Sequence, residues 1–359
     1  MKKILFSAAV LAMMFTSCEK DQDESLAAVE EQQIDMSDFY LYTEDDNSGR
    51  STGGRDCHSM KVLNDKLDKD PSLYASMYNV ESNVRSIINS RSNAKGKPGG
   101  KPGGGDTGGG DTGGGTTDNL GTINIPVVVH VLYSNNSENI SDAQIASQIA
   151  VLNEDFTLQN SDASSVPALF ADRVANSEIT FTLDQTIRKA SSTATWGTND
   201  AMKSSANGGS NVVTPSTHLN IWVCNIGGGI LGYAQFPGGA AATDGVVISP
   251  QYFGSTGTAQ APFDGGRTAT HEVGHWLNLR HIWGDGRCKR DDFVADTPSS
   301  DQPNYSCPSF PTTHCRSTDM TMNYMDYVND DCMYMFSNGQ KERMRALFEA
   351  GGVRSGFIN

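Results

Sequence analysis

The chain has 359 residues, of which 37% are hydrophobic and 19% charged, and its formal net charge is −15 at pH 7. This is enough for one or two domains with a buried core, while 37 glycines predict long irregular stretches. Nucleic-acid binding is disfavoured, because phosphate backbones attract clustered Lys and Arg side chains and the likely core contains no such cluster. The acidic balance is typical of an exported protein.

The N-terminus has the pattern of an export signal. Two lysines precede an apolar run that is too short to span a bilayer, which predicts a signal peptide over residues 1–17. Thr16-Ser17-Cys18 resembles a bacterial lipobox, in which Cys18 is acylated; ordinary secretion with an incidental cysteine is the alternative. The acidic residues that follow resemble the export signal of surface-displayed lipoproteins. We therefore expect an outer-membrane or cell-surface lipoprotein, held to the membrane only by its lipid.

Composition divides the rest of the chain. Residues 18–56 are polar and acidic and predict a lipidated N-terminus with a disordered tether. Residues 57–95 have helical apolar spacing but are too few for a sizeable core of their own. Residues 96–119 contain the repeat GGGDT and predict a flexible linker. Because compact folds rarely contain such a run, residues 120–359 are expected to form one globular domain.

This domain has the element order of a mixed α/β (α+β) fold. Runs rich in β-branched residues predict strands at residues 123–133, 179–187, 219–226 and 245–249. Two helices are expected, over residues 140–156 and from Ser337 to about Ala350. Each begins with a serine followed three residues later by a glutamine, the pattern of a capping box (Ser141 with Gln144, Ser337 with Gln340), and Gly351 marks the end of the second.

The stretch HEVGHWLNLRH, residues 271–281, predicts a metal site. His271 and His275 are four residues apart, so a helix places both imidazoles on one face. Glu272 lies beside them and can reach a water without binding the metal. A continuous helix would turn His281 away, so the chain must leave the helix before it. Asn278 tolerates the left-handed conformation that this break needs.

Three imidazoles with one open position are typical of a catalytic zinc site, in which Glu272 acts as general base and later as acid. Incidental histidines on a helix are disfavoured, because three of the 7 histidines fall within eleven residues in the required registers. Two different interpretations stay open. One is a zinc peptidase of another clan, with a downstream acidic third ligand instead of His281. The second is a non-catalytic surface adhesin that keeps a structural zinc.

The metal motif, with Asn278 in place of a glycine, and the downstream stretches DDFVADTP and MNYMDYVNDDCMYMFSNGQKERM resemble the pappalysin family of metzincin proteases, including its cytophagalysin-like members. The resemblance covers about residues 120–359. It implies a metzincin-type fold: a twisted mixed sheet, an active-site helix, and a C-terminal subdomain with a Met-turn, disulfide-stapled loops and a final helix. The activity implied is peptide-bond hydrolysis in a cleft between two subdomains.

The resemblance also implies roles for single residues. Met325 would form the base of the Met-turn, and Tyr327 would donate a hydrogen bond to the transition state; plain core packing is the alternative for both. Asp330, preferred to Asp331, would line the pocket for the residue just after the scissile bond and select Arg or Lys, unless this is a solvated acidic loop. Residues 227–237 would form the upper rim, where a strand edge can bind an extended peptide.

Cysteines and a candidate second metal complete the set. Four cysteines after the zinc motif allow three pairings, and the resemblance selects Cys288–Cys315 and Cys307–Cys332. Cys224 is expected to be a free buried thiol. Asp292 and Thr297 resemble ligands of a structural calcium, with ordinary turn formation as the alternative.

Cys57 stands apart, upstream of the linker. A tethered thiolate could occupy the open zinc position and keep the enzyme latent. A disulfide with Cys224, a bystander thiol, or His58 as the ligand are the alternatives. Activation would need a cut in the linker or among Arg91, Lys95 and Lys97, which would also release the enzyme from its anchor. The sequence thus predicts a monomeric, latent zinc endopeptidase that acts on proteins or peptides.

Overall fold

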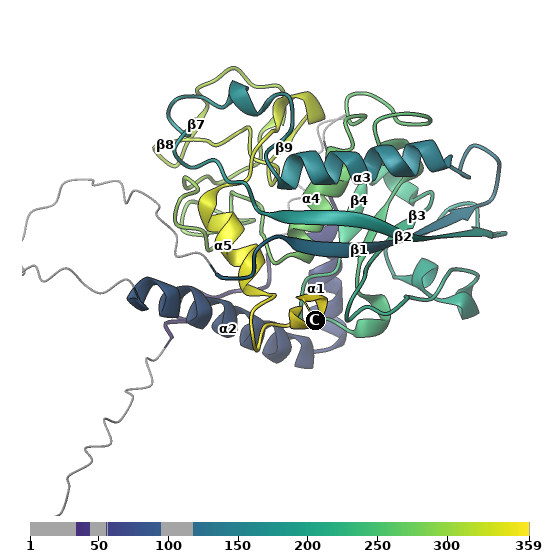
Figure 1. Cartoon of the computed structure of the whole chain (residues 1–359), viewed down its shortest axis with the longest axis horizontal. Coiled ribbons are helices and arrows are strands. Elements are labelled where there is room, and N and C mark those ends of the chain that lie inside the picture. The colour runs from purple at the N-terminus through teal and green to yellow at the C-terminus, as the bar shows by residue number, and fades with distance from the viewer. Residues whose placement is uncertain (1–33, 44–54, 56, 95–117, 359) are drawn as a thin grey trace, which may run out of the picture. The chain divides into compact units, whose positions relative to one another are not determined.

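The chain's structure is a computed structural model that describes residues 34–43, 55, 57–94 and 118–358 (Figure 1). The predicted signal peptide, Cys18, the tether up to residue 33, and most of the linker, with Lys95 and Lys97, lie outside the described residues. Below, "the N-terminal segment" means the described residues between 34 and 94, and "the globular part" means residues 118–358. Among the described helices, none has the length and apolar character needed to cross a bilayer.

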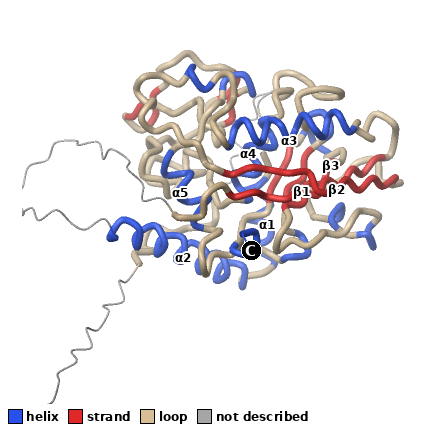
Figure 2. Tube along the Cα trace, viewed as in Figure 1, coloured by secondary structure: helices blue, strands red, loops and turns tan. Residues whose placement is uncertain are grey.

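A five-stranded mixed sheet organises the globular part, with strand order β2-β1-β3-β5-β4. Its strands β1, β2 and β3 are drawn in red and labelled in Figure 2. The strands are β1 (Ile123–Tyr133), β2 (Ile179–Ala190), β3 (Leu219–Val223), β4 (Gly232–Ala234) and β5 (Val246–Ile248). Neighbouring strands are parallel except β4, which pairs antiparallel with β5 at the edge. The twisted mixed sheet of the prediction is therefore present. Strand β3 is shorter than predicted, because Ile226 instead bridges to Trp196 outside the sheet.

Apolar side chains cover both faces of the sheet. Strand β1 has the predicted bounds, and its nearly continuous burial explains its run of Val and Ile residues. On one face, helices α3 (Asp142–Phe156) and α4 (Arg267–Trp276) pack through side chains such as Leu152 and Val273. On the other face, Trp222 and Tyr233 form a second cluster. The active-site helix α4 is thus fixed against the sheet by core packing.

The two predicted helix caps differ in the structure. Helix α5 (Asn338–Ala346) has the complete capping box of Ser337 and Gln340, but it ends before the predicted Ala350 because Leu347 and Phe348 form tighter turns. At α3, the Ser141 hydroxyl accepts a hydrogen bond from the backbone N–H of Gln144. The prediction of a complete capping box is wrong there, because the Gln144 side chain does not bond back to Ser141. The Gln144 amide instead donates to the backbone carbonyls of Pro250 and Phe253, which are buried polar groups that need a partner.

The N-terminal segment contains two helices, α1 (Ser59–Lys69) and α2 (Ser72–Ala94), separated by Pro71. Its apolar residues do not close a core alone. They share one cluster with Phe236 of the globular part, and the members from the segment are Leu41, Met60, Leu63, Leu67, Leu73 and Met77. The described residues from Asp35 onward belong to one compact unit. The segment therefore depends on the globular part for its burial.

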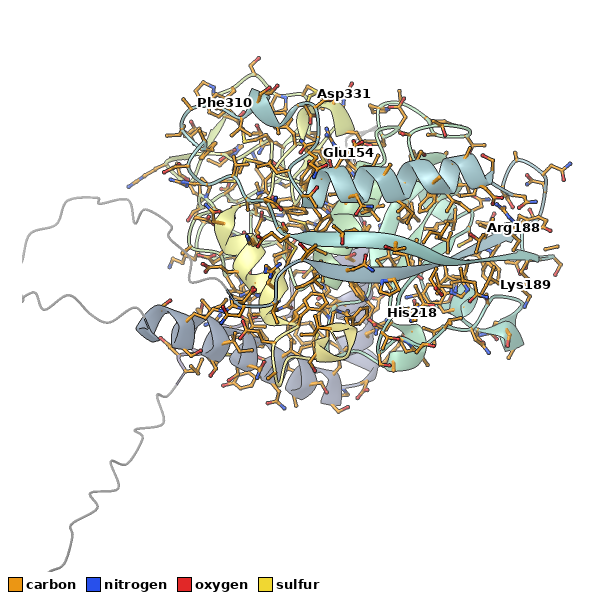
Figure 3. The ribbon with its side chains drawn as sticks, viewed as in Figure 1. Glu154, Arg188, Lys189, His218, Phe310 and Asp331 are labelled. Carbon is orange, nitrogen blue, oxygen red and sulfur yellow. A yellow bond between two sulfur atoms is a disulfide. The ribbon has the colours of Figure 1, made fainter. Side chains whose placement is uncertain are left out.

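Short strands and disulfides shape the region after α4. Strands β6 (Tyr305–Ser306) and β9 (Tyr327–Val328) pair in parallel, and β7 (Thr313–His314) and β8 (Ser317–Thr318) pair antiparallel. The disulfides Cys288–Cys315 and Cys307–Cys332 are both present, with Cα–Cα distances of 5.5 and 5.6 Å, and Cys224 is a free buried thiol as predicted. Phe310 and Asp331 lie at the margin of this region (Figure 3).

Single 3-10 turns complete the described chain. They lie at Ala163–Ser165, Ala201–Lys203, Ser205–Asn207, Gly227–Gly229, Ala241–Thr243, Pro250–Tyr252, Asp330–Cys332 and Ser355–Ile358.

Candidate active site

Helix α4 ends where the sequence predicted a break. Asn278 has a φ of 70°, in the left-handed region. Its backbone N–H donates to the His275 carbonyl, and the Leu279 N–H donates back to the Gly274 carbonyl. These bonds satisfy carbonyls that the end of a helix leaves open and turn the chain back on itself. His281 therefore returns toward His271 and His275.

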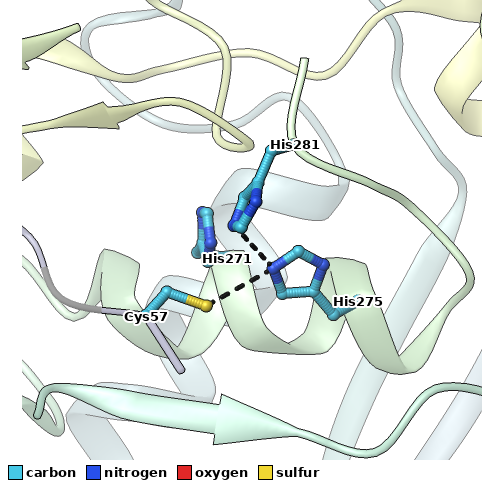
Figure 4. A group of neighbouring side chains, drawn as sticks. All are labelled: Cys57, His271, His275 and His281. Carbon is cyan, nitrogen blue, oxygen red and sulfur yellow. Dashed lines mark hydrogen bonds between the residues drawn. The ribbon is translucent and has the colours of Figure 1, made fainter. Parts of the chain in front are cut away.

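The three imidazoles converge with one thiol. Ligand atoms of Cys57, His271, His275 and His281 all lie within 4.8 Å of one another (Figure 4). The Nε2 atoms of His275 and His281 are 3.1 Å apart, and the Cys57 sulfur lies 3.5 Å from the Nε2 of His275. Figure 4 shows two histidines on α4, the third on the chain that follows, and Cys57 on a separate segment of the chain. The predicted residues are thus brought together from two distant parts of the sequence.

Hydrogen bonds at the other ring nitrogen orient each histidine. The Nδ1 atoms of His271 and His275 lie 2.7 and 2.8 Å from the carbonyls of Tyr324 and Leu279, and Nδ1 of His281 bonds to the Asp285 carboxylate. Because each Nδ1 atom has its own partner, all three Nε2 atoms are left to face the centre of the histidine cluster. Carbonyl and carboxylate partners of this kind orient the histidines of zinc sites. Nε2 of His271 is buried and has no hydrogen-bond partner among the described residues.

The donor set fits a zinc ion. Three imidazole nitrogens and one thiolate make a tetrahedral set that zinc accepts, and the partnerless His271 nitrogen is the buried polar atom that an ion would satisfy. Burial and the neighbouring imidazoles hold the pKa of His271 well below its usual value, and burial does the same for the pKa of His275. Both rings are therefore neutral, which is the form that binds a metal.

Glu272 is buried beside the histidine cluster. Its carboxylate accepts a hydrogen bond from the Ser59 hydroxyl at 2.7 Å, and burial raises the pKa of Glu272. Strand β4 passes close by: a Cβ atom at Gly232 would lie 3.2 Å from the Glu272 side chain and 2.8 Å from the Val247 carbonyl oxygen. Only glycine fits there, so the sheet edge runs directly over the predicted general base.

Met325 and Tyr327 lie on two sides of the cluster. Met325 is fully buried under α4, so close that a Cβ atom at Gly274 would lie 2.5 Å from its sulfur. Tyr327 packs against His281, with ring centroids 4.8 Å apart. Its hydroxyl donates to the backbone carbonyl of Cys57 at 3.2 Å. The phenol therefore points at a peptide carbonyl next to the candidate metal position.

The N-terminal segment lies along the edge of β4, the strand in the predicted upper rim. Cys57 forms a parallel bridge with Gly232, and the His58 N–H donates to the Gly232 carbonyl at 3.1 Å. The backbone N–H of Ala234 donates to the Ser59 hydroxyl at 2.8 Å. Cys57, and no atom of His58, belongs to the group of candidate ligands within the described chain. The sheet edge thus already binds the backbone of the N-terminal segment at Cys57 and His58.

Asp330 lies in a buried pocket that Arg55 fills. The Arg55 guanidinium bonds to the Asp330 carboxylate and donates to Thr268 Oγ1 and the Val328 carbonyl at 3.2 and 3.3 Å. It also lies 5.0 Å from the centroid of the Phe263 ring.

The second oxygen of Asp330 accepts the backbone N–H groups of Gly265 and Arg267, which fixes the carboxylate at the start of α4. Asp331 is exposed, so the preference for Asp330 agrees with the geometry.

Sequence reasoning missed Arg55 and Ser59. Ser59 is the first residue of helix α1, so no strand spacing relates it to Cys57. The partners of Arg55 and Ser59, Asp330 and Glu272, lie more than 200 residues away, so no local pattern pointed to either residue.

The predicted calcium ligands contact each other. Thr297 Oγ1 donates to both carboxylate oxygens of Asp292, at 2.8 and 2.9 Å, and the Val294 N–H donates to Asp292 as well. These bonds are those of an ordinary turn. Calcium at this loop stays a prediction.

The fold and the histidine cluster define a metzincin-type zinc protease. Residues 213–349 match the family profile described as pregnancy-associated plasma protein-A. Extracellular metalloprotease 1 of Coccidioides posadasii is 35% identical over 244 residues, which is 64% of this chain and 79% of that protein. The extracellular metalloprotease of Pyricularia oryzae is 33% identical, over 63% of this chain and 75% of its own. The chain therefore belongs to the pappalysin family of zinc metalloproteases and is a metalloendopeptidase.

Solved structures support the same assignment. Mature mirolysin of Tannerella forsythia in complex with a cleaved peptide is 50% identical, with a TM-score of 0.64, and covers 66% of this chain and 95% of its own. A promirolysin mutant of Tannerella forsythia is 42% identical, with a TM-score of 0.71, and covers 84% of this chain and 97% of its own. The precursor structure thus matches a larger share of this chain than the mature one does.

Proposed function

We propose that this metalloendopeptidase is made as a latent precursor in which His271, His275 and His281 hold zinc and Cys57 occupies the fourth position. The observation that carries the proposal is the convergence of three oriented imidazoles with one thiol. The position of His281 in this cluster disfavours a protease with an acidic third ligand. The buried carboxylate of Glu272 beside the cluster disfavours an adhesin with a purely structural metal.

The catalytic roles follow from the positions of the side chains. When bound, zinc polarises a carbonyl and lowers the pKa of a water to about 7. Glu272 accepts the proton of the attacking water and later delivers it to the leaving amine. Tyr327 donates to the carbonyl oxygen as negative charge develops; its hydrogen bond to the Cys57 carbonyl supports this direction. Met325 forms the apolar floor under α4.

Latency rests on three contacts, made by Arg55, Cys57 and Ser59. Arg55 fills the Asp330 pocket, Cys57 lies at the metal position, and Ser59 donates to Glu272. Each contact blocks one requirement of the reaction. Arg55 occupies the pocket for a substrate side chain, Cys57 occupies the open position at the metal, and Ser59 engages the general base. Because the three residues lie within five positions of one chain, their contacts with the globular part are made and lost together. We propose that cleavage after this stretch releases them and also separates the enzyme from its N-terminus.

The direction of the chain supports the proposal that the N-terminal segment is not itself a substrate. If the Asp330 pocket takes the residue after the scissile bond, a substrate runs from the metal position to the pocket in the N-to-C direction. The N-terminal segment runs from the pocket, at Arg55, to the metal position, at Cys57. Its peptide bonds therefore cross the site with reversed polarity, and Glu272 faces the Ser59 hydroxyl instead of a water.

Arg55 also supports a proposal for the side chain that the pocket accepts. Three acceptors surround its guanidinium, on Asp330, Thr268 and Val328, and the Phe263 ring lies beside it. A lysine ammonium is a point charge that cannot reach this spread of acceptors. We propose that the enzyme cleaves before Arg in preference to Lys.

A peptide-library digest tests the specificity. The processed protein should enrich Arg just after the cut, and Thr268→Val should reduce the Arg-over-Lys ratio about tenfold, because it removes one hydrogen bond to a charged group at nearly constant shape. Glu272→Ala is the control for contaminating proteases and should release no product. A flat profile after the cut would reject the pocket assignment, while cleavage by the Glu272→Ala variant would reject the general base.

Export and lipid attachment at Cys18 are part of the proposal. The relatives named extracellular metalloproteases support export. Mass spectrometry of the N-terminal peptide tests acylation, which Cys18→Ala should abolish. Calcium removal by a chelator that spares zinc should lower the Tm if Asp292 and Thr297 bind calcium, and leave it unchanged if they only form a turn.

A further inference from the structure

Tyr40 of the N-terminal segment binds a loop of the globular part outside the zinc site. The guanidinium carbons of Arg280 and Arg290 lie 4.6 and 4.0 Å from the centroid of its ring. The Phe293 ring packs against it at 5.4 Å in an edge-on arrangement. Two cations over one aromatic ring, with a second ring at the side, make a recognisable binding arrangement for an aromatic side chain.

The polar atoms of Tyr40 are bound as well. Its hydroxyl lies within hydrogen-bonding distance of the backbone carbonyl oxygens of Gly284 and Asp291, at 2.8 Å from the latter. Arg280 donates to the Tyr40 backbone carbonyl at 2.6 Å. Burial raises the pKa of Tyr40 to about 12, so the phenol remains a neutral donor. We call Arg280, Gly284, Arg290, Asp291 and Phe293 the Tyr40 clamp.

The globular part builds the clamp with its own backbone. Gly284 has a φ of 62°, and a Cβ atom there would lie 2.7 Å from the Asp291 nitrogen. The two carbonyl-bearing stretches are therefore held close by a contact that only glycine permits. Phe293 also has a positive φ, of 64°, a conformation that is costly for a bulky residue and tends to occur at ligand-binding positions.

Removal of the N-terminal segment would leave the clamp empty. Leu41, next to Tyr40, is buried in the apolar cluster with Met60, Leu63 and Leu67 of α1, so Tyr40 leaves with the segment. Arg280 and Arg290 would then lose their shared aromatic partner. One nitrogen of Arg280, Nη1, is already buried without a hydrogen-bond partner among the residues that the structure describes. A vacated clamp would hold two guanidinium groups, with the Asp285 carboxylate within electrostatic reach.

We propose that the Tyr40 clamp is a second binding site of the mature enzyme, filled by a tyrosine side chain of a protein substrate. The proposal rests on the proposed maturation of the precursor. The pair of carbonyl acceptors selects tyrosine over phenylalanine, and the two guanidinium groups select an aromatic ring. A substrate held at the clamp raises its effective concentration at the zinc site without a new contact there.

Binding of the chain's own segment tests the clamp directly. The probe is a fluorescent peptide of residues 34–43, titrated into the processed protein in the Glu272→Ala background, which prevents cleavage. The peptide should bind, Tyr40→Ala in the peptide should abolish the signal, and Tyr40→Phe should weaken it about fivefold, the loss of one hydrogen bond. Arg290→Ala in the protein should weaken binding about fivefold to tenfold through the lost cation–π contact. Lys289→Ala, which removes an exposed neighbouring cation, is the matched control and should change it little.

Cleavage then separates this proposal from the proposed function. Arg290→Ala should lower kcat/KM for a protein substrate with an exposed tyrosine several-fold more than kcat/KM for a short peptide. Equal affinities of the Tyr40→Ala and wild-type peptides would contradict the proposed clamp but not the proposed protease activity. Equal losses of affinity in the Arg290→Ala and Lys289→Ala proteins would do the same. Loss of short-peptide cleavage in the processed wild type would reject the proposed function, and the binding titration would still decide the clamp.

Discussion

The stretch of residues 271–281 and the N-terminal segment contribute to the same site in different ways. The first supplies three histidines and Glu272 within eleven residues, held by one helix, one left-handed residue and hydrogen bonds at each Nδ1. The second supplies single side chains, such as Arg55 and Ser59, that meet partners more than 200 residues away. The local stretch should therefore outlast removal of the segment, whereas the segment's contacts are separable from the metal site.

The largest effect is expected at His281. His281→Ala removes one of three protein ligands, so zinc content should fall and peptide cleavage should drop by at least about a thousandfold, since the metal is needed for the reaction. Metal analysis after dialysis, with kcat/KM, measures both. Glu272→Ala is the comparison: it should keep zinc while losing activity. Full zinc retention in His281→Ala would favour a different third ligand.

Cys57 gives the next largest effect, on latency instead of catalysis. The intact precursor carrying Cys57→Ala should cleave a short peptide on the order of a hundredfold faster than the wild-type precursor, because a metal–thiolate contact is lost. Cys224→Ala removes the other free thiol and should leave latency unchanged. Equal activity of all three intact precursors would show that Cys57 does not hold the enzyme latent.

Ser59→Ala should have a smaller effect in the same assay. Its hydroxyl bond to a carboxylate corresponds to about 1.5–3 kcal/mol, or roughly tenfold to a hundredfold in the population of active precursor. The exposed Ser72→Ala is the matched control. The pair Cys57→Ala with Ser59→Ala should exceed either single change. If Ser59→Ala had no effect even in the Cys57→Ala background, the bond to Glu272 would not contribute to latency.

Asn278 tests the local half of the comparison. Asn278→Val places a β-branched residue at a φ of 70°, which should cost about 1–2 kcal/mol and lower both the Tm and zinc affinity. Asn278→Gly should retain both, because glycine adopts this conformation freely. Calorimetry of the two variants with zinc measures the difference. Equal behaviour would mean that the break does not depend on this residue.

The smallest effect concerns acid. Burial raises the pKa of Glu81 on α2, but ion pairs with Arg343 and Arg85 outweigh it and bring the pKa to about 2. The stabilisation from Glu81 is therefore complete above its unfolded pKa of about 4.3 and is lost as the pH falls toward about 2. Tm values of the precursor and of Glu81→Gln should differ most near neutral pH and converge across this window. A constant difference would contradict the assignment.

Features that depend on nearby residues could be predicted from the sequence, and features that depend on distant residues could not. The break at Asn278, the strand β1 and the capping box of Ser337 were predictable because each depends on neighbours within a few residues. The roles of Arg55 and Tyr40 were not, because their partners Asp330 and Arg290 are brought to them only by the tertiary fold. Gln144 failed as half of a capping box for the same reason, since the buried carbonyls of a distant loop compete for its amide.

X-ray absorption at the zinc edge of the full-length precursor tests the central claim most directly. The arrangement of Cys57, His271, His275 and His281 predicts three nitrogens at about 2.0–2.1 Å and one sulfur at about 2.3 Å, and loss of the sulfur scatterer in Cys57→Ala. A first shell without sulfur in the wild-type precursor, or with fewer than three imidazoles, would contradict it.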